Sequence, residues 1–231
     1  MKLVFSLSLA FATTLFASGP FDTTRLQAGR FVYRATQHGK VIGTFTLTIT
    51  PQADGTTIFT GDAEGFHQHW RAATKADFTP LFAELRIRSD SGSSYAMDVR
   101  YENYTARGVI AKAPAPDKPT VCSVPADTVD QRLDWAAMLS TRLTVGEELA
   151  FHVYDPDSGL TPVLGSFHGV EKISLNLGTY EALRLRYRMA KSEGPESYDI
   201  LITQDVPRIM LREEFPDGTV TELIEAHPTG I

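Results

Sequence analysis

Residues 41–50 read VIGTFTLTIT and contain a strict two-residue alternation. From residue 44 onward every second residue is threonine, and Phe45, Leu47 and Ile49 lie between the threonines. Successive side chains of a β-strand point to opposite faces, so the segment predicts a strand with one apolar and one hydroxyl-bearing face. The same alternation recurs along the chain and indicates antiparallel sheet with one buried and one solvated side.

About a dozen segments between residues 30 and 226 carry strand signals, and turn residues such as Gly39, Gly55 and Gly218 separate them. One segment, Thr128–Leu143, has helical spacing instead, with a capping-box start at Thr128–Gln131. Its apolar residues lie on more than one side, so we expect it to pack between two surfaces. The sequence therefore predicts a mainly β protein: a curved antiparallel sheet, as a half-barrel or open β-barrel, with one short α-helix packed against it.

Residues 113–125 contain four prolines, and proline cannot donate a hydrogen bond to a sheet ladder. We interpret this stretch as a surface linker within one domain, because strand signals lie on both sides of it. Residues 18–231 are therefore expected to form a single β-rich domain.

Residues 1–17 have the composition of a secretory signal peptide. Lys2 gives a positive start, residues 3–16 carry no charge, and Ala17 is a small residue suited to cleavage. The run is shorter than the ~20 apolar residues of a membrane span, and an uncleaved N-terminal anchor is the alternative. No cysteine lies near the cut to accept a lipid. We expect an exported, periplasmic protein of a Gram-negative bacterium, with no transmembrane span in the mature chain.

The formal net charge of −6, with no basic tail, argues against nucleic acid as a partner and against adhesion to anionic lipid surfaces. The single cysteine, Cys122, cannot form an internal disulfide. We expect it to serve as a small, partly buried apolar residue, with an intermolecular disulfide or a reactive thiol as the alternative.

Two groups of arginines are candidates for an anion site, since guanidinium offers a planar fork of donors. The alternative is a solvated sheet face on which these arginines pair with carboxylates of neighbouring strands. The candidate arginines are Arg86, Arg88, Arg100, Arg184, Arg186 and Arg188, and the available partners are Glu84, Asp98, Glu213 and Glu214.

Metal and catalytic motifs are weak. His67 and His69 would share a strand face but lack a third ligand at a defined spacing, and residues 155–159 read as a turn rather than a calcium loop. Residues 165–169 have the wrong order for a nucleophile elbow. Glu213 and Glu214 would point to opposite faces and form no acid/base dyad. We expect no metal, no cofactor and no enzymatic activity.

The inward aromatic and methionine side chains are the candidate ligand-binding residues. They either fill a packed core or line an apolar cleft between the curved sheet and the helix. The candidates are Phe31, Tyr33, Phe45, Tyr95, Met97, Trp135, Met138 and Tyr187, with Tyr101 and Met189 as further members of this face.

Residues 170–185 read VEKISLNLGTYEALRL, and residues 33–44 hold YRA followed by GKVIGT. With the late Asp205–Pro207 segment, these motifs resemble a family of exported bacterial proteins known as domain of unknown function 3108. The resemblance covers most of the mature chain and implies a periplasmic, largely antiparallel β fold similar to the half-barrels of periplasmic lipoprotein carriers. It carries no catalytic residues to transfer.

We therefore expect a non-enzymatic module that binds a lipid or another apolar or amphipathic ligand of the cell envelope. A structural or protein-interaction component of the envelope, which would meet its partner through an edge strand or the arginines, is the alternative. A hydrolase with a site assembled from distant residues is a third reading, and it would need three convergent titratable groups in one cleft.

Overall fold

The computed structural model describes residues 20–89, 93–142, 144, 146–191 and 194–230. The expected signal peptide lies outside these residues. The helical elements are η1 (Thr23–Arg25), η2 (Glu64–Phe66), η3 (Gln131–Leu133) and α1 (Asp134–Ser140). The strands are β1 (Gly29–Gln37), β2 (Lys40–Pro51), β3 (Thr57–Ala63), β4 (Gln68–Thr74), β5 (Pro80–Arg88), β6 (Ser94–Glu102), β7 (Thr105–Ala113), β8 (Lys118–Ser123), β9 (Thr128–Asp130), β10 (Glu148–Asp155), β11 (Gly159–Leu175), β12 (Gly178–Lys191), β13 (Gly194–Thr203), β14 (Met210–Glu214) and β15 (Thr219–Pro228).

All these strands belong to one sheet in the order β8-β7-β6-β5-β4-β3-β2-β1-β15-β14-β13-β12-β11-β10-β9. Neighbouring strands are antiparallel except β9 and β10, which are parallel. β1 pairs with β15, so the first and last described strands meet in the middle of the sheet. The sheet does not close, because β8 and β9 are its two edges. The prediction of a curved, open, mainly antiparallel sheet is confirmed.

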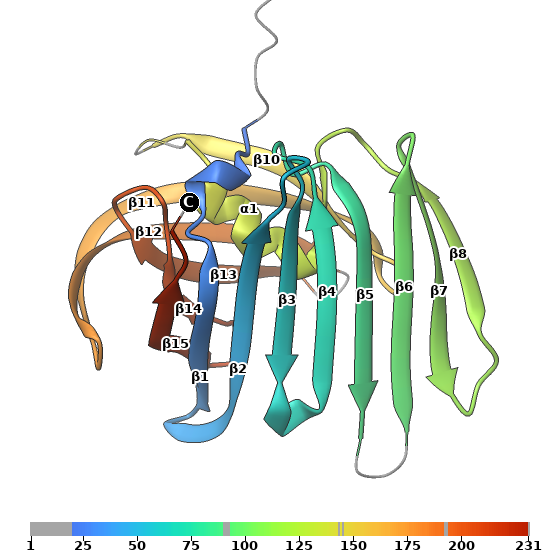
Figure 1. Ribbon diagram of the computed structural model, residues 1–231, viewed down its shortest axis with the longest axis horizontal. Helices are drawn as coiled ribbons and strands as arrows, with labels where there is room; N and C mark the ends of the chain where they lie inside the picture. The colour runs from blue at the N-terminus through green and yellow to red at the C-terminus, as the bar shows by residue number, and fades with distance from the viewer. Residues whose placement is uncertain (1–19, 90–92, 143, 145, 192–193, 231) are drawn as a thin grey trace, which may run out of the picture.

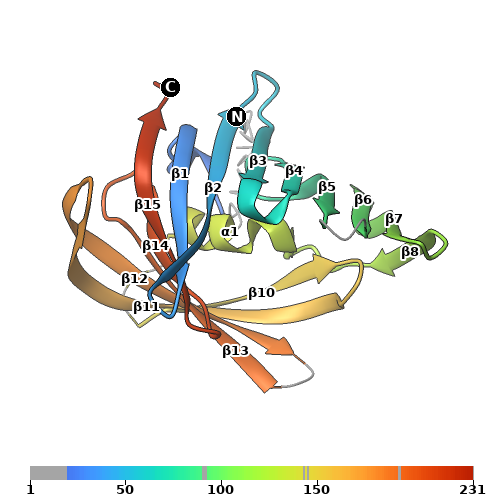
Figure 2. The same ribbon diagram turned by 90° about the horizontal axis from the view of Figure 1, so that it is seen from below.

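The sheet curls around its own interior, and α1 lies inside the curl. Figure 1 shows β1 to β8 as one wall with β10 to β13 crossing behind it, and Figure 2 shows α1 between the two. Side chains near the β9 edge join the walls: the hydroxyl of Tyr101 on β6 donates to Asp130 Oδ2 at 2.5 Å. The ring of Tyr101 also meets that of Tyr154 on β10 edge-on, with centroids 6.1 Å apart.

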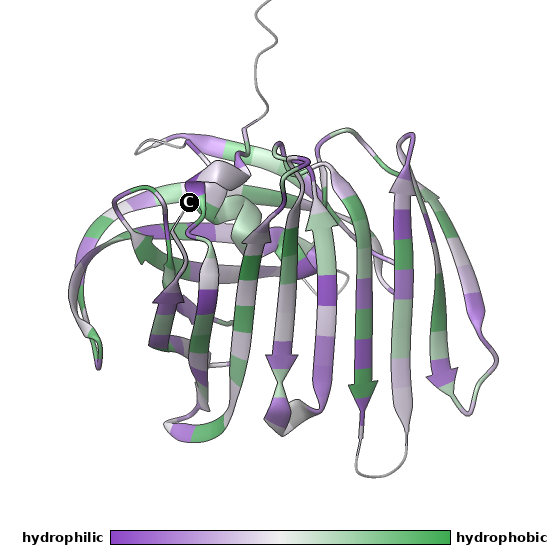
Figure 3. Cartoon of the chain, in the orientation of Figure 1, coloured by the Kyte–Doolittle hydropathy of each residue, from purple (hydrophilic) through white to green (hydrophobic). Residues whose placement is uncertain are grey.

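The two-residue alternation determines which side of the sheet faces inward. On β2, Leu47 and Ile49 are buried and Phe45 packs against the core, whereas the threonines between them lie on the outer face. Figure 3 shows the corresponding alternation of hydropathy along the strands. The predicted apolar and hydroxyl-bearing faces of this strand are confirmed.

The helix is shorter than predicted and starts later. Residues 128–130 form β9, because they hydrogen-bond in parallel to β10, so Thr128 does not begin a helix. Asp130 instead caps η3, the 3-10 turn that precedes α1, and its carboxylate accepts from the backbone N–H of Arg132 at 3.0 Å. The helix ends at Ser140 because Thr141 has an extended backbone. The predicted end, Leu143, lies outside the described residues.

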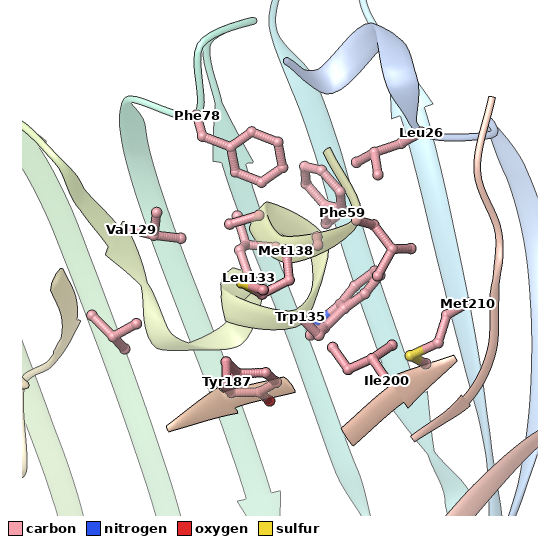
Figure 4. Close-up of a cluster of buried hydrophobic side chains, with 14 of the residues drawn as sticks. Leu26, Phe59, Phe78, Val129, Leu133, Trp135, Met138, Tyr187, Ile200 and Met210 are labelled. Atoms are coloured by element: carbon pink, nitrogen blue, oxygen red, sulfur yellow. The ribbon is translucent and has the colours of Figure 1, made fainter. Parts of the chain in front are cut away.

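The helix packs on both sides, as its apolar residues predict, and Trp135 to Ser140 are all buried. In Figure 4, Phe59 and Phe78 lie on one side of α1, and Tyr187 and Ile200 lie on the other. Among the described residues no helix combines the length and the apolar character that crossing a bilayer requires.

The proline-rich stretch is not only a linker, because β8 occupies its second half. This strand pairs with β7 alone and forms one edge of the sheet. Pro119 is accommodated there because an edge strand has one side that needs no ladder partner. Cys122 on β8 is half-buried and packs against the core.

Candidate ligand-binding pocket

A cavity of about 470 Å³ lies between the concave side of the sheet and the start of α1. Residues of β1 to β4 line one side, residues of β12 to β15 line the other, and η3 and α1 close it. We call it the aromatic pocket and define it by the six rings in its lining: Phe45, Trp70, Trp135, Tyr187, Tyr198 and Phe215. Its volume falls within the range of about 300–1,000 Å³ typical of small-molecule sites.

Ring stacking holds much of this lining in place. The rings of Tyr187 and Tyr198 stack with centroids 4.8 Å apart, and Phe215 meets Tyr198 edge-on at 5.8 Å. On the opposite wall Phe45 stacks on Tyr33 at 4.8 Å. Such pairs favour one arrangement of rings, so the pocket is preformed.

The two tryptophans are fixed from behind. Trp135 donates its indole N–H to the carbonyl of Arg132 at 3.0 Å and meets Phe59 edge-on. The indole of Trp70 lies directly on Gly61, where an added Cβ would be 2.1 Å from Nε1. Glycine at this position is therefore what allows the tryptophan ring to lie against the sheet.

Glu213 is the buried acidic group of the pocket and is only 6% exposed. Its Oε1 accepts a hydrogen bond from the hydroxyl of Tyr187 at 3.0 Å. Burial raises the pKa of the Glu213 carboxyl to about 8, the nearby Asp134 carboxyl raises it too, and the Tyr187 hydrogen bond opposes both. A carboxyl with this pKa is mostly protonated at neutral pH.

Thr221 lies directly opposite Glu213 in the pairing of β14 with β15 and also lines the pocket. It is 5% exposed, and its hydroxyl oxygen has no hydrogen-bond partner within the described part of the chain. An unpaired buried hydroxyl is costly, and a ligand atom could satisfy it. Glu213, Thr221 and the hydroxyl of Tyr187 together give an otherwise apolar pocket a small polar region.

Arg132 also lines the pocket, but its charge is cancelled. Its guanidinium contacts the fully buried Asp130 and also lies 2.7 Å from the carboxylate of Asp155. Burial lowers the pKa of this guanidinium, but Asp130, Tyr101 and Asp155 together raise it by more, so the net pKa lies above its ordinary value. The Arg132 guanidinium therefore links β9 to β10 through these two carboxylates.

Three of the eight residues predicted from the sequence line the aromatic pocket: Phe45, Trp135 and Tyr187. Tyr33 lies behind Phe45 and donates its hydroxyl to the carbonyl of Met210 at 3.1 Å. The structure places the other four elsewhere. Fully buried core positions hold Phe31, Met97 and Met138, and Tyr95 is half-buried beneath Lys112 at the end of β7.

Glu213, Trp70, Tyr198 and Phe215 line the pocket but were not among the predicted ligand-binding residues. For Glu213 a signal was present, since the alternation Leu211, Glu213, Phe215 places it on an apolar face. Treating Glu213 as a partner for the surface arginines was wrong, because it points into the interior. The prediction that Glu213 and Glu214 point to opposite faces is confirmed, because Glu214 pairs with Arg184 outside.

Four of the six candidate arginines form ion pairs on the outer face of the sheet. Arg86 pairs with Asp98 at 2.8 Å, and Arg100 pairs with Glu84 at 3.1 Å. On β12, Arg184 contacts Glu171, Asp199 and Glu214, and Arg186 contacts Asp199. The alternative in which these arginines pair across strands is therefore the one that the structure supports for these four.

The weak motifs have structural roles. His69 contacts Asp62 at 2.6 Å, and the described residues contain no group of three potential metal ligands. Asp155 accepts backbone N–H groups of its own turn. Ser166 and His168 share a hydrogen bond of 2.9 Å on the surface of β11, which is not a strand-to-helix turn.

A second cavity, of about 460 Å³, lies among loops between β4 and β5, β6 and β7, and β8 and β9. Its lining consists largely of polar turn residues such as Lys75, Asp77 and Asn103. Because ligand sites are mostly apolar with a few converging polar groups, the aromatic pocket is the better candidate.

Two solved structures resemble the chain at low sequence identity. A β-barrel-like protein of the domain family DUF1849 from Brucella abortus has a TM-score of 0.61 at 10% identity, and the match covers 90% of this chain and 100% of that one. A candidate lipoprotein from Parabacteroides distasonis, also at 10% identity, has a TM-score of 0.37, and the match covers 90% and 99% of the two chains. The first likeness supports the β-barrel-like fold.

No curated protein matches the chain. The profile of one family, described as "Protein of unknown function (DUF3108)", matches residues 24–225. This match spans nearly the whole sheet, from the residues before β1 into β15, and agrees with the motifs noted in the sequence. The chain belongs to the DUF3108 family.

Proposed function

We propose that this protein is an exported, non-enzymatic module of the Gram-negative periplasm that binds an apolar or amphipathic ligand of the cell envelope in the aromatic pocket. The observation that carries the proposal is the preformed cavity of about 470 Å³ with six aromatic rings in its wall. The signal-peptide composition of residues 1–17 supports export. The volume suits one chain or the apolar part of a larger molecule.

Two features favour a binding module over the interaction protein considered above. Most of the arginines that would meet a partner are engaged with carboxylates of the same sheet face. The β8 edge carries Lys118 and Pro119, residue types that discourage pairing with another strand.

The direct test is organic extraction and mass spectrometry of the full-length protein purified from the periplasm of its native host. We expect a near-stoichiometric apolar or amphipathic molecule. A matched pair of variants locates it: Ala63→Phe fills the pocket lining, whereas Ala113→Phe adds the same ring at the exposed end of β7.

Only the Ala63→Phe variant should lose the bound molecule. Fluorescence offers an independent readout, because both tryptophans of the chain line the pocket. Titration with monolauroylglycerol, an uncharged amphiphile, should change the emission of the wild type but not of Ala63→Phe. Protein that carries no ligand and gives no fluorescence response would overturn the proposal.

A further inference from the structure

The charged groups around the aromatic pocket are mainly acidic. Asp62, Asp134 and Glu213 line it, and Arg132 is the basic residue among its described lining. Arg132 is already engaged by two carboxylates of the β9 edge. A lining whose charged groups are mainly acidic disfavours carboxylate, sulfate and phosphate groups in a ligand.

Glu213 has no cationic partner within the described residues, although its carboxyl is almost fully buried. Its one hydrogen-bond donor is the neutral hydroxyl of Tyr187. On either side in the sheet it faces Thr221, whose hydroxyl is unpartnered, and Ile200. A buried carboxyl without a counter-charge is expensive to keep, so its presence needs a reason beyond packing.

Aromatic rings line the same cavity as this carboxyl. Tyr187 contacts it directly, Tyr198 stacks on Tyr187, and Trp135 and Trp70 line the same cavity. The faces of tryptophan and tyrosine rings attract cations, and quaternary ammonium groups in particular bind in such aromatic enclosures. A carboxylate at the wall of an aromatic pocket is a suitable counter-ion for a bulky, weakly hydrated cation.

We propose that the aromatic pocket selects a cationic amphiphile, in which an ammonium group sits between the Glu213 carboxylate and the aromatic rings and an apolar body fills the rest of the cavity. This proposal rests on the proposed function and names the chemical class of its ligand. The hydroxyl of Thr221 is placed to accept or donate one further hydrogen bond to such a head group.

The protonation of Glu213 gives the proposal a distinctive signature. The groups that face it are Tyr187, Asp134, Tyr33 and Tyr198, and burial raises the pKa of all three tyrosines, so they remain neutral. Since the pKa of Glu213 is about 8, binding of an ammonium ion beside the Glu213 carboxylate must displace the proton of that carboxyl. As the pH increases toward about 8, affinity for a permanently charged cation should rise about tenfold per pH unit. Above about pH 8 the affinity should level off.

The experiment compares three probes with the same twelve-carbon chain below their micellar concentrations: dodecyltrimethylammonium, monolauroylglycerol and dodecanoate. Tryptophan fluorescence of the full chain gives each dissociation constant. We expect the cation to bind at least about tenfold more tightly than the neutral probe at about pH 8, and dodecanoate to bind most weakly.

Glu213→Gln keeps the shape and hydrogen-bonding capacity of the side chain but removes the charge. This variant should lose the preference for the cation and its pH dependence while still binding monolauroylglycerol. Glu214→Gln, one residue away on the outer face, should keep both. Circular dichroism and thermal unfolding confirm that each variant is folded before it is titrated.

The outcomes separate the two proposals. If none of the probes binds, the pocket is not a ligand site and the proposed function fails. If the neutral or anionic probe binds as tightly as the cation, or if Glu213→Gln keeps the preference, the charge assignment fails while the proposed function stands.

Discussion

The hydroxyl of Tyr187 lies 3.0 Å from Oε1 of Glu213, a carboxyl group that is 6% exposed. A phenol can donate to a carboxyl group but cannot neutralise it. The pair therefore fixes the position of the carboxyl and leaves its protonation to depend on pH and on what occupies the pocket.

The first prediction concerns the stability of the folded chain against pH. The pKa of Glu213 is about 8 when folded and near the ordinary 4.5 when unfolded, so the unfolded chain loses its proton first as the pH rises. The free energy of unfolding of the wild type, relative to Glu213→Gln, should be highest below about pH 4.5 and fall by about 1.4 kcal/mol per pH unit up to about pH 8. Urea unfolding at five pH values measures this difference.

Two tyrosine variants control this experiment. The Tyr187 hydrogen bond lowers the pKa of Glu213, so Tyr187→Phe should extend the fall in stability to higher pH. Tyr198→Phe removes a hydroxyl that donates to Glu196 instead and should leave the upper limit unchanged. A constant offset between wild type and Glu213→Gln, with no slope, would contradict the burial of an isolated carboxyl.

The second prediction concerns Asp130, which is fully buried and accepts hydrogen bonds from Arg132 and from the hydroxyl of Tyr101. Asp130→Asn removes the main charge partner of a buried guanidinium and should destabilise the protein by about 3–5 kcal/mol. Asp98→Asn breaks the exposed pair with Arg86 and should cost about 1 kcal/mol or less. Equal losses for the two variants in urea unfolding would show that the β9 edge does not depend on this network.

The third prediction concerns Arg208, which donates to the carbonyls of Leu139 and Thr141 at 2.9 and 2.8 Å at the end of α1. Burial lowers the pKa of this arginine to about 10. Arg208→Met leaves both carbonyls unsatisfied and should lower the free energy of unfolding by about 1–3 kcal/mol. Arg142→Met, on an exposed arginine just past the same helix, should change it by less than about 0.5 kcal/mol.

The fourth prediction concerns Gly61. Gly61→Ala places a methyl group within 2.2 Å of the Trp70 indole, so the ring must move, at a cost of about 1–3 kcal/mol. In a Trp70→Leu background the same substitution should cost far less, because the clashing ring is gone. A double-mutant cycle measures this coupling. Additive effects would show that Trp70 does not lie on Gly61 in solution.

Periodicity was enough to predict the fold class because it depends on local chemistry. Phe45, Leu47 and Ile49 alternate with threonines, and a strand with this pattern can bury only one face. The start of the helix was not predictable in the same way. Thr128 suits a helix cap and a strand equally well, and pairing with β10, more than twenty residues later, decides between them.

The pocket was predicted only in part for a similar reason. The sequence marks Phe45, Trp135 and Tyr187 as inward-facing, but it does not say which inward residues fill the core and which border a space. That distinction depends on how far the two walls of the sheet separate around α1. The alternation of Leu211, Glu213 and Phe215 did contain a signal for a buried acid. The hydrogen bond from Tyr187 to this acid depends on the tertiary fold and could not be read from that alternation.

The adjacency of β1 and β15 has a consequence for how the chain matures. β1 pairs along its whole length with the ten-residue strand β15 on one side and with β2 on the other. A nascent chain that has completed β2 to β14 still exposes one flank of its first strand, and a bare flank of this kind invites association with other chains. That side of β1 is covered only when β15 is present, so a C-terminal truncation before Thr219 should yield an aggregating product rather than a smaller stable domain.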